Sequence, residues 1–136
     1  MSKGTTTGLS LADLNLNTQC ERAHEFEYLD PQGRPTGVFL SVLGSQSPTV
    51  QKWIRGQLNT RRTREAMAAK RGKELETTVE DDEEFTIESA AIRLVGWRGI
   101  SEPFSPGLGL ELMSINAEAR AQVFKASNDL GNFTKG

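Results

Sequence analysis

The stretch ERAHEFEYLDPQGRPTGVFLSVL, residues 21–43, has the clearest structural signal in this sequence. His, Phe and Tyr alternate with two glutamates over residues 24–28. Over residues 36–43 Val38, Leu40 and Val42 point to one side, and Phe39, Ser41 and Leu43 point to the other. A period of two is typical of β-strands. Proline and glycine lie between the two runs, at residues 30–35, where a turn needs a fixed or a positive φ. These residues predict a β-hairpin, which must lie on helices or pair with another chain because an isolated hairpin is marginally stable.

Helices are expected after the hairpin. A serine followed by a proline occurs at residues 47–48 and again at 105–106. This pair favours a helix start, because the serine caps free N–H groups and proline suits the first helical position. We therefore predict helices over about 48–70 and 106–113, and a last helix over 117–130. The predicted buried stripe of the last helix has spacings of three and four and consists of Ile115, Ala119, Val123, Ala126 and Leu130.

A charged segment at residues 60–84 lies where two blocks of opposite charge meet. Eight basic residues and one acidic residue lie between Lys52 and Lys73, whereas residues 74–88 hold eight acidic residues and no basic one. An amphipathic helix is predicted over 85–95, ended by Gly96, with the acidic block before or within its first turns. The two blocks either neutralise each other within the chain or contact a charged protein partner.

Together these elements predict an α+β fold that is mostly α, with an N-terminal β-hairpin followed by three to four helices. The 136 residues fit a single domain with tails. We assign residues 21–133 to that domain, 1–20 to a flexible N-terminal arm that docks by its leucines or is irregular, and 134–136 to a tail.

The sequence offers no catalytic, cofactor or metal site. One cysteine, Cys20, and one histidine, His24, exclude an internal disulfide and a zinc site with several thiolates. We interpret them as a surface thiol and a histidine on a strand face. No glycine-rich phosphate loop occurs, and the acidic residues 80–84 lack the spaced ligands and turn glycine of a calcium loop. We expect a non-enzymatic protein without cofactor.

Charge and hydropathy favour a soluble protein of the cytoplasm. The net charge is −2, no apolar run could span a membrane, and residues 1–8 lack a secretory signal. The basic segment has no aromatic residue after Trp53 that could stack on bases, so nucleic acid is not the expected partner.

Several motifs, in order, resemble the small tail assembly chaperones of long-tailed, siphovirus-type phages. YLDPQGRPTGVFLSVLGSQSPTVQKWIR is similar to the family's strand, turn, strand and serine-rich helix entry. AAIRLVGWRGI resembles its Ala-rich helix ending in Gly-Trp, and EPFSP its loop before the next helix. NAEARAQVFKASNDLGNF resembles the closing helix. The resemblance spans about residues 26–133; the charge blocks at 60–84 and the glycines at 107 and 109 have no counterpart in it.

The resemblance implies binding rather than catalysis. Family members coat the tape measure protein, keep it soluble and help recruit tail tube subunits around it. They act in the host cell cytoplasm and are not expected in the mature virion. Some phages also make a longer, frameshifted product, and this chain resembles the short version.

Seven residues are predicted to contact the partner, through an apolar groove, a free hairpin edge or charge. They are Leu11, Leu14, Phe39, Trp53, Arg61, Arg62 and Trp97. The two tryptophans also fit core packing between helices. The sequence is also compatible with a homo-oligomer whose subunits contact each other through the hairpin edge or the leucine arm. Two alternatives remain: a structural tail or head-tail connector component of the virion, and a nucleic-acid-binding regulator that uses the basic helix.

Overall fold

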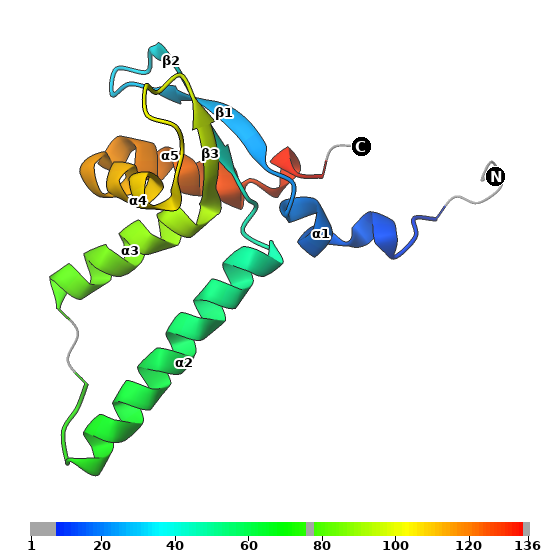
Figure 1. The fold of residues 1–136 in the computed structure, drawn as a ribbon. Coiled ribbons are helices and arrows are strands. Elements are labelled where there is room, and N and C mark those ends of the chain that lie inside the picture. The colour runs from blue at the N-terminus through cyan, green and yellow to red at the C-terminus, as the bar shows by residue number, and fades with distance from the viewer. Residues whose placement is uncertain (1–7, 76–77, 135–136) are drawn as a thin grey trace.

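The computed structural model describes residues 8–75 and 78–134, and these form an α+β fold (Figure 1). The predicted fold class, mostly α with an N-terminal hairpin, is confirmed. None of the helices in these ranges is long and apolar enough to cross a membrane. Predictions for residues 1–7 of the arm, Glu76 of the charged segment and residues 135–136 of the tail lie outside the described residues. The elements in chain order are η1 (Ala12–Leu14), α1 (Leu16–Cys20), β1 (His24–Leu29), β2 (Pro35–Val42), α2 (Pro48–Lys70), α3 (Val79–Arg93), β3 (Leu94–Arg98), α4 (Pro106–Ile115), α5 (Ala117–Asn128) and η2 (Leu130–Asn132).

The hairpin is the first part of a three-stranded antiparallel sheet with the order β1-β2-β3. Phe26 pairs with Leu40 across the hairpin, and Leu40 pairs with Trp97 on the other side. The prediction that a helix continues to residue 95 and ends at Gly96 is therefore wrong, because β3 begins at Leu94. The third strand makes β2 the central strand, so the hairpin is stabilised within the chain.

Helix α3 also begins earlier than predicted. A capping box starts it: the Thr78 hydroxyl accepts from the Asp81 N–H, and the Asp81 carboxylate accepts from the Thr78 N–H. The acidic block therefore forms the first turns of α3, where its charge complements the helix dipole. Helix α4 is two residues longer than predicted, whereas α2 has the predicted bounds and α5 ends at Asn128.

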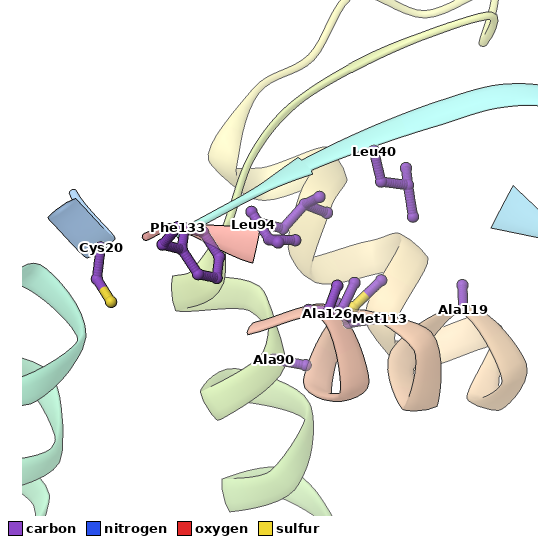
Figure 2. Packing of buried hydrophobic residues seen from close by; sticks show 10 residues of the cluster. Cys20, Leu40, Ala90, Leu94, Met113, Ala119, Ala126 and Phe133 are labelled. Atoms are coloured by element: carbon purple, nitrogen blue, oxygen red, sulfur yellow. The ribbon is translucent and has the colours of Figure 1, made fainter. Parts of the chain in front are cut away.

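The core lies between one face of the sheet and helices α3, α4 and α5 (Figure 2). Leu40 and Val42 of the central strand, Met113 of α4 and Val123 of α5 are fully buried. Four of the five residues in the predicted stripe of the last helix are buried or half-buried, as expected. Ile115 is the exception: 73% of its surface is exposed, because it ends α4 and does not belong to α5.

A buried arginine fastens the C-terminal end of α3 to α5. Arg93 is 6% exposed, and its guanidinium donates to Ser127 Oγ at 3.1 Å and to the Ser89 carbonyl at 2.7 Å. It also lies over the ring of Phe124 at 5.0 Å. Burial lowers the pKa of Arg93. These contacts hold the last turns of α3 in the body of the molecule.

Helix α1, which precedes the sheet in the chain, contributes its last residue to the core. Cys20 ends α1 and is completely buried, packed against Gly44 and near Phe133. The interpretation of Cys20 as a surface thiol is therefore wrong. Its neighbours in sequence are polar, but the contact that buries it comes from a residue 24 positions later. His24 lies half-buried on β1, with its ring edge to face with Phe133.

Helix α2 stands largely outside this core. It begins at Pro48, next to the sheet, and runs away from the sheet beside α3 (Figure 1). Of its 23 residues only Val50 is buried. Most of the helix is thus in contact with solvent. Its N-terminal end is held at the body, where the Thr49 N–H donates to the Glu21 carboxylate at 3.1 Å.

Two glycines should respond oppositely to the same substitution. A Cβ at Gly44 would collide with Cys20 Sγ, so Gly44→Ala should lower the free energy of unfolding by about 1–3 kcal/mol. A Cβ at Gly56, inside α2, would meet nothing, so Gly56→Ala should raise it by about 1 kcal/mol. Urea denaturation of both variants tests this; a neutral Gly44→Ala would show that α1 is not packed against this turn.

Candidate functional site

A groove of about 400 Å³ runs between α2 and α3. Its apolar lining comes from Leu58 of α2, Phe85 of α3 and Leu75 of the connecting segment. Leu58 is 51% and Phe85 is 45% exposed, so a bound partner could cover both. We call this feature the α2–α3 groove; its other lining residues are Gln57, Thr60, Arg61, Arg64, Asp81, Asp82, Glu84 and Glu88.

The local sequence places these side chains on facing surfaces. In α2 the Ser47 hydroxyl accepts from the Val50 N–H at 3.1 Å, which fixes the start of the helix. Gln57, Arg61 and Arg64 then follow at spacings of four and three, so they share one face. In α3 the same spacing brings the acidic residues of the groove onto one face: Asp81, Glu84 and Glu88.

One aromatic contact connects the two helices beside the groove. The rings of Trp53 and Phe85 lie 5.3 Å apart between centroids and are tilted by 32°. Such a pair contributes about 0.5–1.5 kcal/mol beyond the area that it buries. Val50 is the only buried residue of α2, and within the described residues this is the one aromatic pair that joins α2 to α3.

The charges that line the groove are not paired across it. Among the described residues three ion pairs occur, and none joins α2 to α3. Arg61 lies 3.5 Å from Glu65 of its own helix, with both side chains about half exposed. An exposed pair of this kind contributes little. The two charge blocks are therefore near each other without direct neutralisation, and both can meet a partner.

The seven predicted contact residues do not form one site. Arg61 lines the groove and Trp53 contacts its Phe85, so the structure brings these two together. Arg62 is exposed on α2 but does not line the groove. Leu11 and Leu14 are 88% and 59% exposed, on the segment that extends from the sheet toward the N-terminus (Figure 1).

The two remaining predicted residues belong to the sheet. The ring of Phe39 lies 4.0 Å beneath the Arg98 guanidinium, and Arg98 also makes two bonds to the Glu25 carboxylate, at 2.9 and 3.0 Å. These bonds lower the pKa of Glu25. Trp97 is edge to face with Phe104, at 5.0 Å, in a local packing contact. The side chains of Phe39 and Trp97 thus already have partners within the chain, Arg98 and Phe104.

The hairpin edges are less open than expected. Strand β3 occupies the outer edge of β2, so β1 and β3 are the edges of the sheet. On β1 the side-chain amide of Gln122 accepts from the Leu29 N–H at 3.0 Å and donates to the Leu29 carbonyl at 2.8 Å. These two bonds occupy backbone groups that an added strand would need.

The described residues contain no group of three or more His, Cys, Asp or Glu side chains placed to hold a metal ion. Comparison of the chain with protein-family models, with curated proteins and with solved structures finds no match. The groove offers apolar side chains flanked by charges that are not paired across it, which suits binding of another protein.

Of the eleven residues that line the groove, only Arg61 was predicted from the sequence as a contact residue. The prediction missed the shared face of the acidic residues and the apolar members Leu58, Leu75 and Phe85. The signal for the acidic face was present, because Asp81, Glu84 and Glu88 have helical spacing. The predicted helix starts at residue 85, so the prediction does not place these three residues on one helical face. No local signal indicates that Phe85 meets Trp53, 32 positions earlier.

Removal of the Phe85 ring should loosen α2 without unfolding the body. Phe85→Ala loses the contact with Trp53, so amide hydrogens of α2 should exchange about fivefold faster, while those of the sheet keep their protection. Leu110→Ala, at a similarly exposed residue of α4, is the control and should leave α2 unchanged. Equal loss of protection in α2 and the sheet would contradict this account.

Proposed function

We propose that this protein is a phage tail assembly chaperone that binds the tape measure protein through the α2–α3 groove. The observation that carries the proposal is the groove itself, with Leu58 and Phe85 about half exposed between two helices. An apolar groove between helices suits an amphipathic helix laid into it by its apolar face. A long helical tape measure protein would offer many such faces.

The properties of the groove fit a partner that must be released. Its apolar members are few and only partly exposed, and charged side chains surround them. A small, charged contact supports a moderate and exchangeable affinity rather than a permanent one. Many weak copies along one long partner would still keep it soluble through multivalency.

The motif resemblance supports the same proposal and is only partly matched by the fold. The hairpin, the Ser47-Pro48 helix start and the closing helix occur as the family pattern implies. The Gly96-Trp97 pair differs, because it lies within β3 and does not end a helix. The resemblance therefore contributes the identity of the partner, and the groove contributes the means of binding it.

Under this proposal the protein acts in the host cell cytoplasm with the tape measure and tail tube proteins, and leaves before the virion matures. Mass spectrometry of purified virions should accordingly find tail tube peptides and lack peptides of this chain. Its presence in stoichiometric amount would instead support the alternative, a structural tail or connector component.

Charges placed in the groove should weaken capture of the tape measure protein. In co-expression with that protein, the variant Leu58→Glu with Phe85→Glu should reduce the co-purified partner about tenfold, because carboxylates would replace the apolar contact. The matched control, Leu110→Glu with Ile115→Glu, adds the same charge at exposed apolar residues of α4 and should retain the partner.

Two outcomes of the co-expression experiment contradict the proposal. One is a tape measure protein that stays soluble without this chain. The other is equal capture by the groove variant and the control variant, with both shown by circular dichroism to be folded.

A further inference from the structure

We infer that the α2–α3 groove binds its partner helix in one direction, and that the opposite charges of α2 and α3 set that direction. This inference rests on the proposed function and names the chemistry of the partner. The occupant is an amphipathic helix with an apolar stripe, acidic residues on one flank of the stripe and basic residues on the other.

The distribution of charge in the groove is one-sided. The α2 side contributes Arg61 and Arg64, which we call the basic row, and none of the acidic lining residues. The α3 side contributes Asp81, Glu84 and Glu88, which we call the acidic row, and none of the basic lining residues. Asp82, also acidic, belongs to α3 as well.

These charges are available to a third helix. Within residues 8–75 and 78–134, neither row forms an ion pair with the other helix. Arg61 has the exposed Glu65 as its neighbour, at 3.5 Å, and a stronger partner could replace it. The Asp81 carboxylate is engaged in the helix cap, which leaves Glu84 and Glu88 as the free members of the acidic row.

A helix in the groove with its apolar stripe toward Leu58 and Phe85 presents one flank to α2 and the other to α3. Turning the helix end for end, with the stripe kept in place, exchanges the two flanks. In one direction acidic residues meet the basic row and basic residues meet the acidic row. In the other direction acidic residues meet the acidic row and basic residues meet the basic row. Repulsion between like charges disfavours this direction, as it does at the flanking positions of coiled coils.

The direction can be measured with a synthetic peptide that forms the required helix. It has about 20 residues, leucines along one face, glutamates on one flank and lysines on the other. A dansyl group is attached to its N-terminus or to its C-terminus as an acceptor of tryptophan emission. Trp53 lies in the first turns of α2, toward the sheet, and serves as the donor. The protein carries Trp97→Phe so that Trp53 is its only tryptophan.

The expected result is strong energy transfer to one end of the peptide and weak transfer to the other. In a charge-exchanged variant the opposite end of the peptide should receive the strong energy transfer. The affinity of that variant for the peptide should stay within about threefold of the parent's. That variant has no change in net charge and keeps the Asp81 cap; it consists of Arg61→Glu, Arg64→Glu, Glu84→Lys and Glu88→Lys. The matched control makes the same exchanges outside the groove and should behave as the parent; it consists of Arg22→Glu, Arg55→Glu, Glu102→Lys and Glu111→Lys.

Equal transfer to both ends, the same preferred end in the charge-exchanged variant, or no binding of the peptide would overturn the inference. These results are distinguishable from failure of the proposed function. A protein that still captures the tape measure protein but binds the peptide in both directions retains the function and lacks the directional groove. A protein that captures no tape measure protein at all lacks the function.

Discussion

Helix α2 has almost no core of its own, and this constraint shapes the candidate site. It is 23 residues long, yet only Val50 is buried, and the partly exposed rings of Trp53 and Phe85 join it to α3. Helices in water are stabilised mostly by packing of an apolar face. A helix with so little packing is held by its N-terminal cap, by the contact of its first turn with the body and by one aromatic contact with α3, which leaves the neighbouring surface open to solvent.

Helix α3 makes this arrangement possible because its two halves have different tasks. Its C-terminal half is fixed in the body through Ala90 and Arg93, whereas its acidic first turns extend from the body beside α2. The capping box at Thr78 keeps those first turns helical despite their charge. The sheet, α4 and α5 thus form a base from which two helices project, and our proposal places binding on those two helices (Figure 1).

The sequence predicted those elements whose signals are local. The hairpin and the bounds of α2 follow from alternation, turn residues and a serine–proline cap. Strand β3 was missed because its five residues continue an amphipathic helix and because its partner, β2, lies more than 50 positions earlier. Burial of Cys20 and the groove residue Phe85 depend on similarly distant contacts. Of the predicted contact residues, Arg61 and Trp53 lie at the groove; the others lie elsewhere.

The central claim is that the surface between α2 and α3 receives a helix from another protein. The most direct measurement is a titration of the ¹⁵N-labelled protein with an amphipathic segment of the tape measure protein, followed by amide chemical shifts. Shifts should concentrate in Pro48–Lys70 and Val79–Arg93 and leave the free face of α4 unchanged. Shifts confined to the sheet or to the N-terminal segment, or no shifts at saturating peptide, would contradict the account.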